Sequence, residues 1–149
     1  ASAGTTPTMM RVKRVLLAAS GAMVLALVLA ATAQAKTSFF RLPSGNIGCV
    51  YDSSPAYLRC DITSGLKPKP SRPASCDLEW GDSVTLSRAG KTRLSCHGDT
   101  VFDPGAKVLR YGTTWTARPY TCTSRTTGLT CENAGGHGFF LSRQSWRRF

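Results

Sequence analysis

The sequence has few of the side chains from which catalytic and metal sites are usually built. Its 149 residues include two histidines, His97 and His137, and eight acidic residues. No Cys-x-x-Cys pair and no closely spaced pair of histidines is present, and structural zinc sites depend on such pairs. A Gly-x-Ser-x-Gly nucleophile motif is also missing. We therefore expect no metal, no cofactor and no catalytic residue.

Large aliphatic residues are scarce as well. From residue 36 onward, Leu, Ile, Val and Phe together supply 21 of 114 residues, a proportion typical of disordered chains. The same segment carries all six cysteines and all 13 aromatic residues, which favour a small folded domain stabilised by disulfides. Length and composition exclude a coiled coil, a polytopic membrane protein and a multi-domain enzyme. No segment shows a sustained helical pattern of apolar residues.

The parts of a secretory signal peptide follow one another within residues 9–35. A basic start, Arg-Val-Lys-Arg, precedes 17 uncharged residues from Val15 to Ala31, and an Ala-x-Ala site ends at Ala35. We expect cleavage near Ala35, which releases a single secreted domain of residues 36–149; an uncleaved anchor helix is the alternative. Residues 1–8 precede the first methionine, and we interpret them as upstream residues that are not native.

An even number of cysteines in an exported domain predicts three disulfides, for which the sequence permits fifteen pairings. The Leu-x-Cys units that end at residues 60, 96 and 131 favour one of them, because residues two apart on a strand share a face. Each unit follows another cysteine across a turn-rich connection. Nearest-neighbour pairing would close three hairpins: Cys49–Cys60, Cys76–Cys96 and Cys122–Cys131. Each bridge is worth roughly 2–4 kcal/mol.

Short segments rich in β-branched and aromatic residues recur between Gly- and Pro-containing breakers. They predict an all-β fold, a small antiparallel sandwich or barrel. The expected strands are 38–42, 47–51, 57–62, 84–87, 93–97, 107–111, 113–117, 120–123, 129–132 and 138–142. The basic, proline-rich run 67–73 is expected to be an exposed connection.

Several of these segments resemble an uncharacterised family of small secreted, six-cysteine proteins of high-GC Gram-positive bacteria. The resemblance covers residues 39–149 and is carried by FRLPSGNIGC (40–49), LRCDI (58–62), CDLEWG (76–81) and CTSRTTGLTCENAGGHGFFLSR (122–143). It implies export, disulfides and a compact domain. It brings no activity, ligand or catalytic residue.

The positive charge points to acidic partners. The whole chain carries a net charge of +11, and residues 36–149 keep 16 basic against eight acidic residues. For an exported protein we expect an anionic cell-wall polymer, a glycan or an acidic protein as the partner, and no nucleic acid. Solubility alone is the alternative reason for the charge, and the sequence does not indicate an oligomeric state.

Six residues are candidates for ligand binding. His137 and Arg143 flank a glycine-rich strand end, His97 and Asp99 form a second polar cluster, and Trp115 and Trp146 are candidates for an aromatic platform. Three of them have a structural alternative: His137 as a turn residue, Asp99 in an Asx turn, and Trp146 in a tail that closes the fold.

These features favour a secreted, non-enzymatic binding module of the cell envelope or medium, for an anionic or glycan ligand. A secreted inhibitor of a lysozyme- or protease-type hydrolase is the alternative, because preorganised loops lose little entropy on binding. A hydrolase is the third hypothesis.

Overall fold

The computed structural model describes residues 1–4 and 34–149 of the chain. Residues 33–149 form one compact unit. Within the described part, regular secondary structure consists of β-strands alone, and no helix is long and apolar enough to cross a membrane. The signal peptide predicted for residues 9–35 lies almost entirely outside the described residues.

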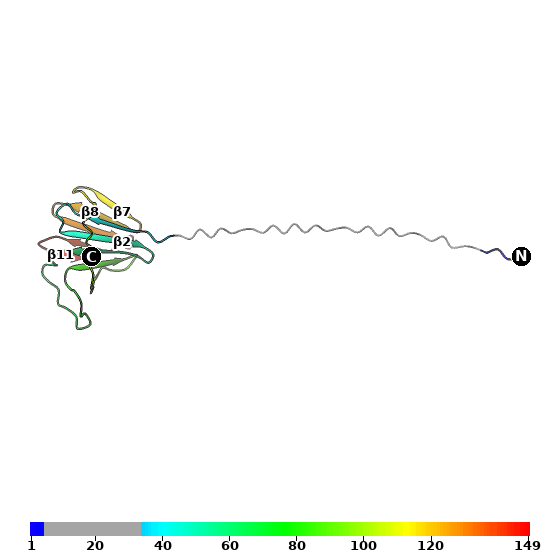
Figure 1. Ribbon diagram of the computed structural model, residues 1–149, viewed down its shortest axis with the longest axis horizontal. Helices are drawn as coiled ribbons and strands as arrows, with labels where there is room; N and C mark the ends of the chain where they lie inside the picture. Colours follow the sequence, from blue (N-terminus) through cyan, green and yellow to red (C-terminus); the bar gives the residue numbers. More distant parts are fainter. Residues whose placement is uncertain (5–33) are drawn as a thin grey trace. The chain divides into compact units, whose positions relative to one another are not determined.

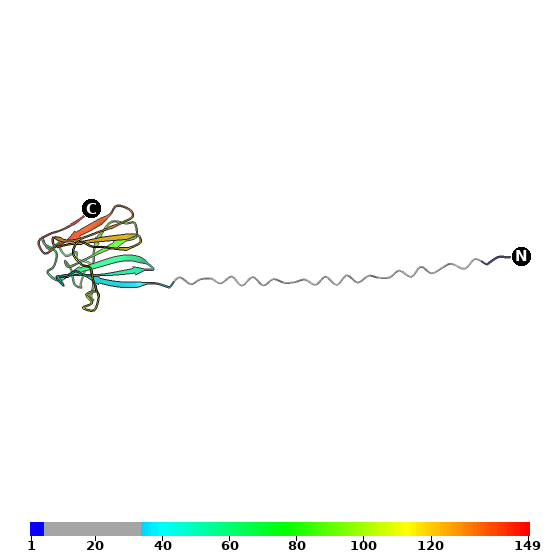
Figure 2. The ribbon, with the colours of Figure 1, turned by 90° about the horizontal axis from the view of Figure 1, so that it is seen from above.

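Within residues 34–149, eleven strands form two sheets that pack face to face (Figure 1). The view from above shows the two layers, with the orange and red C-terminal strands in one and the cyan strands in the other (Figure 2). The predicted all-β class is confirmed, and of the two expected forms the sandwich is the one observed.

The larger sheet has the strand order β5-β4-β3-β2-β1-β6. Adjacent strands in this sheet are antiparallel, except for β1 and β6, which are parallel. The strands are β1 (Thr37–Arg41), β2 (Ile47–Ser53), β3 (Ala56–Ile62), β4 (Ser83–Ser87), β5 (Arg93–Leu94) and β6 (Lys107–Val108).

The smaller sheet has the order β11-β10-β9-β8-β7 and is antiparallel throughout. Its strands are β7 (Thr114–Ala117), β8 (Tyr120–Arg125), β9 (Gly128–Asn133), β10 (Gly138–Leu141) and β11 (Trp146–Arg148). Short strands therefore form the edges of both sheets: β5 and β6 in one, β7 and β11 in the other.

The core lies between the sheets, where alternate residues of each strand point inward. In β8, for example, Tyr120 and Cys122 are buried while the intervening Thr121 is half-exposed. Phe40 from the larger sheet and Phe139 from the smaller one are among the largest fully buried side chains. This alternation allows a sequence with few large aliphatic residues to bury a continuous apolar layer.

Polar side chains also join the two sheets. The buried Tyr120 donates a hydrogen bond from its hydroxyl to the carbonyl of Ala56 on β3, at 2.9 Å. The side-chain amide of Asn133 donates to the carbonyls of Ser87 and Gly90, both at 2.9 Å. Burial raises the pKa of Tyr120 to about 12, because the ionised phenolate is poorly solvated there.

The predicted disulfide pairing is confirmed for all six cysteines. Cys49–Cys60 and Cys122–Cys131 each join directly opposite residues of a hairpin, β2–β3 and β8–β9, with Cα atoms 4.1 Å apart. All four cysteines are fully buried. Leu58 and Leu129, two residues before a cysteine, are buried on the same face, as the Leu-x-Cys spacing predicts.

The third disulfide does not close a two-stranded hairpin, so this part of the prediction is wrong. The strand β4 lies between Cys76 and Cys96 and pairs with β3 and β5, and both cysteines lie in irregular segments. Glu79 and His97 form a single isolated bridge next to the disulfide. Leu78, two residues after Cys76, is 54% exposed, because Cys76 belongs to no strand that would direct both side chains inward.

Two strands are much shorter than expected, and one is additional. The expected strands 93–97 and 107–111 are regular only at Arg93–Leu94 and Lys107–Val108. The chain after Leu94 turns away to form the bridge between His97 and Glu79. At the C-terminal end of the chain, β11 adds to the smaller sheet beside β10.

Candidate functional site

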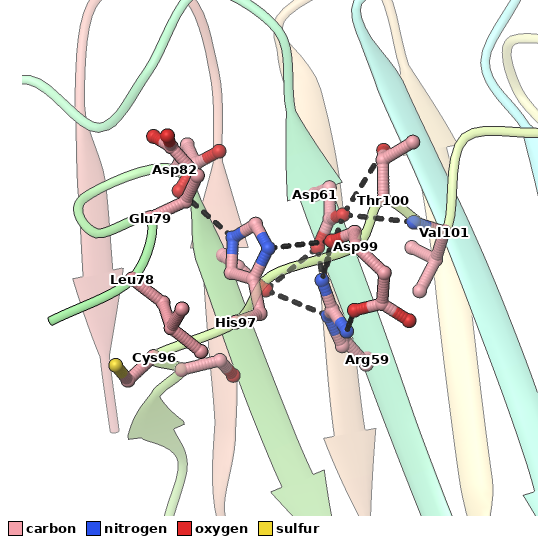
Figure 3. A network of polar contacts seen from close by, with 12 residues as sticks. Arg59, Asp61, Leu78, Glu79, Asp82, Cys96, His97, Asp99, Thr100 and Val101 are labelled. Carbon is pink, nitrogen blue, oxygen red and sulfur yellow. Dashed lines mark hydrogen bonds and ion pairs between the residues drawn. The ribbon is translucent and has the colours of Figure 1, made fainter. Parts of the chain in front are cut away.

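A polar network covers the outer face of β3, where the sequence places two charged residues two positions apart (Figure 3). Asp61 is 5% exposed although it points away from the core. Its carboxylate accepts hydrogen bonds from the Arg59 guanidinium at 3.0 and 3.1 Å, from the Ser83 hydroxyl at 2.6 Å and from the backbone N–H of Val101 at 2.9 Å. The carboxylate therefore fixes the segment around Val101 to the sheet.

Arg59 connects this buried carboxylate with Asp99, one of the predicted site residues. Its guanidinium donates to the Asp99 carboxylate at 2.9 Å and to the Asp99 carbonyl at 2.8 Å. The hydrogen bond from Arg59 lowers the pKa of Asp99. For Arg59, burial alone would lower the pKa, but the two carboxylates outweigh it and the pKa is raised.

His97, the second predicted residue of this cluster, already uses both ring nitrogens. Nδ1 lies 2.6 Å from the carbonyl oxygen of Asp99 and Nε2 lies 3.0 Å from a carboxylate oxygen of Asp82. A carbonyl oxygen can only accept a hydrogen bond, so Nδ1 carries a hydrogen atom and donates the bond. The histidine is 8% exposed, and neither ring nitrogen is left to contact a substrate. This arrangement suits a residue that holds its loop in place.

Trp115, the third candidate, lies at a cavity between the edges of the two sheets. Its ring packs on Phe40 of β1, with ring centroids 4.8 Å apart, and on Tyr51 at 5.7 Å. The cavity has a volume of about 590 Å³ and is lined by Phe40, Lys107, Val108, Leu109, Arg110, Thr113, Thr114 and Trp115. We call it the edge cavity. Its lining combines an aromatic floor with two exposed cations and contains no acidic residue.

Arg143 lies at a second cavity, of about 260 Å³, at one end of the sandwich. Its lining comes chiefly from three turns, at residues 43–46, 125–128 and 142–144. We call it the turn pocket. The other cation of its lining is Arg125, and again no acidic residue lines it.

The remaining two candidates are held in place by hydrogen bonds within the fold. His137 lies in the turn between β9 and β10, where its backbone N–H donates to the Asn133 side chain at 3.1 Å and its carbonyl accepts from the Asn133 N–H at 2.9 Å. Trp146 is half-buried against the core, and its indole N–H donates to the carbonyl of Pro68 at 2.9 Å. Arg148 lies over the Trp146 ring, 5.5 Å from its centroid.

The six predicted residues therefore do not form one site. His97 and Asp99 are together, whereas Trp115, Arg143, His137 and Trp146 each lie in a different environment. The residues that complete the two basic cavities, Lys107, Arg110 and Arg125, were not singled out from the sequence. Their only signal is a positive charge next to an expected turn, which many exposed residues of this chain share. Among the described residues, no cluster of three or more metal-ligating side chains occurs.

Comparison with known sequences gives the family. A family of unknown function (DUF6636) matches residues 19–149. The chain belongs to this family. The match includes the whole described sandwich, and the family description carries no activity or ligand. No curated protein matches the chain. No solved structure matches it either.

Proposed function

We propose that this domain is a non-enzymatic binding protein that holds an anionic glycan in the edge cavity. The observation that carries the proposal is the pairing of an aromatic floor, Trp115 on Phe40, with Lys107 and Arg110 in the same lining. The apolar face of a sugar ring packs on an aromatic side chain, and a phosphate or carboxylate substituent binds the cations. One cavity thus offers both contacts that such a ligand needs.

The size and the charges of the cavity support this ligand class. A volume of about 590 Å³ lies within the range of ordinary ligand pockets. Neither Lys107 nor Arg110 takes part in an ion pair among the described residues. By contrast, the Asp99 carboxylate forms an ion pair with Arg59, and an Asp82 carboxylate oxygen lies 3.0 Å from Nε2 of His97.

The three disulfides support the proposed location of the ligand. Disulfides persist in oxidising compartments, so a polymer of the cell envelope or the medium is the ligand that the domain would meet. The alternatives, an inhibitor of a hydrolase and a hydrolase, stay predictions. No described feature specifically favours either one, and the occupied ring of His97 argues against its use as a general base.

The proposal is tested by co-sedimentation of the oxidised protein with purified Gram-positive cell walls, before and after removal of their anionic polymers, at low and high salt. We expect binding to intact walls at low salt and its loss in the other conditions. The double variant Lys107→Glu/Arg110→Glu should bind at least about tenfold more weakly, as expected when charge-assisted hydrogen bonds are removed.

A matched control lies at the opposite edge of the same sheet. Lys91 and Arg93 are both exposed near β5, whereas Lys107 belongs to β6, the other edge strand. The double variant Lys91→Glu/Arg93→Glu changes the net charge by the same amount and should bind like the wild type. Equal weakening by both double variants would mean that net charge alone drives binding, and the edge cavity would lose its role.

A further inference from the structure

Most of the lining of the turn pocket comes from segments that carry the family resemblance described above. The turn 43–46 comes from FRLPSGNIGC, the turn 125–128 lies within the segment 122–143, and the turn 142–144 lies at the end of that segment. These segments lie on different strands, and the sandwich brings their turns to one end. The outer walls of the pocket are therefore turns, while Leu42 and Ile47 form its buried apolar base.

Hydrogen bonds fix the first turn before any ligand binds. The N–H of Gly45, which has φ +67°, donates to the carbonyl of Leu42 at 3.0 Å. Asn46 is 8% exposed, and its side chain donates to the Ser64 hydroxyl at 3.2 Å and accepts from the Ser64 N–H at 3.1 Å. This turn has little freedom left to lose on binding.

The other two turns, which carry the arginines, are fixed as well. A Cβ atom on Gly128, at φ +146°, would lie 2.3 Å from the carbonyl oxygen of Leu141, so the turn after Arg125 packs directly on β10. The Ser142 hydroxyl accepts hydrogen bonds from the N–H groups of Gln144 and Ser145, at 3.2 and 3.0 Å. These bonds bend the chain at Arg143.

The charges of the pocket are not balanced by the protein. Arg125 and Arg143 both line it, and neither takes part in an ion pair among the residues that the structure describes. The rest of the lining includes hydroxyl and amide groups, among them Thr126, Tyr111 and Gln144, that can donate hydrogen bonds to an anion. Guanidinium groups match the oxygen pairs of phosphate and carboxylate groups.

We infer that the turn pocket is a binding site for a single oxyanion group, a phosphate or a carboxylate, held between Arg125 and Arg143. Its volume of about 260 Å³ suits a small anion or the charged end of a larger molecule. The site does not depend on the proposed function, because it shares no lining residue with the edge cavity. Both arginines line the same pocket, and an oxyanion bound there would balance their charge.

The test is an NMR titration of the oxidised full chain with inorganic phosphate, and separately with acetate, at constant ionic strength set with chloride. We expect saturable shifts of the backbone amides of Thr126, Gly128 and Gln144 with at least one of the two anions. Phosphate alone would assign the site to phosphate groups, and acetate alone to carboxylates.

Variants decide whether the arginines hold the anion. Arg125→Gln/Arg143→Gln should weaken binding at least about tenfold. The control Arg88→Gln/Arg93→Gln removes the same charge from exposed positions in and near the β4–β5 hairpin and should leave binding unchanged. The edge-cavity variant Lys107→Glu/Arg110→Glu should also keep it. The inference would be overturned if neither anion produced saturable shifts, or if the Arg125→Gln/Arg143→Gln variant bound the anion as tightly as the wild type.

Discussion

Arg59 bonds two carboxylates in very different surroundings, and the structure predicts that only one of them matters for stability. Asp61 is 5% exposed and accepts hydrogen bonds from Arg59, Ser83 and Val101. Asp61→Ala removes the carboxylate that accepts these hydrogen bonds and leaves the Arg59 guanidinium, whose side chain is 13% exposed, with one carboxylate. Breaking a buried pair in this way costs about 3–5 kcal/mol. The Asp99 side chain is 78% exposed, so Asp99→Ala should cost far less because water and salt screen the pair.

The comparison is made by urea unfolding of both variants, monitored by tryptophan fluorescence and circular dichroism. Asp61→Asn is a second control, because it keeps the size of the side chain and one acceptor oxygen, and it should be intermediate. Should Asp61→Ala lose no more stability than Asp99→Ala, the network would not hold the segment 99–101 as described.

Three further predictions concern single features of the sandwich. Mild reductant followed by alkylation and mass spectrometry should label Cys76 and Cys96 first, because Cys96 is exposed whereas the other two disulfides are fully buried; simultaneous labelling would contradict this. Stability should fall by about 2 kcal/mol between pH 10 and 12, because burial raises the pKa of Tyr120 to about 12. Its contribution is fully present well below pH 10, where the phenol is protonated in both states, and is lost as the pH rises through 12. Unfolding at a series of pH values measures this slope, which Tyr120→Phe should reduce. Gly128→Ala should destabilise strongly, since the added methyl would meet a β10 carbonyl at 2.3 Å, and an unchanged melting temperature would refute that contact.

The sequence predicts the parts of the fold that depend on alternation within a strand. Leu58 with Cys60 and Leu129 with Cys131 show which face is buried, and the same spacing leads to the correct disulfide pairing. It fails at Leu94 and Cys96, where the spacing is the same but the chain leaves the strand. The chain leaves the strand because His97 forms a bridge with Glu79, and no local sequence pattern predicts this bridge.

The candidate sites were predicted less well, because they depend on which turns the sandwich brings together. Trp115 and Arg143 were singled out as residue types, and the structure places each at a basic cavity. Arg110 is close to Trp115 in the sequence, but Phe40, which completes that cavity, comes from the other sheet. Arg125 and Arg143 are far apart in the sequence, and the pairing of β8, β9 and β10 brings their turns to the same end of the smaller sheet. The sequence makes His97 a candidate because the chain has two histidines, but both of its ring nitrogens bond within the fold.

The central claim is that the edge cavity binds an anionic glycan. The most direct measurement is an NMR titration of the full chain with a purified, soluble fragment of an anionic wall polymer, observing the Trp115 indole resonance and the amides of residues 107–114. We predict saturable shifts confined to these groups in the wild type and their loss in Lys107→Glu/Arg110→Glu. Shifts that lie elsewhere on the domain, or no saturable shifts, would contradict the claim.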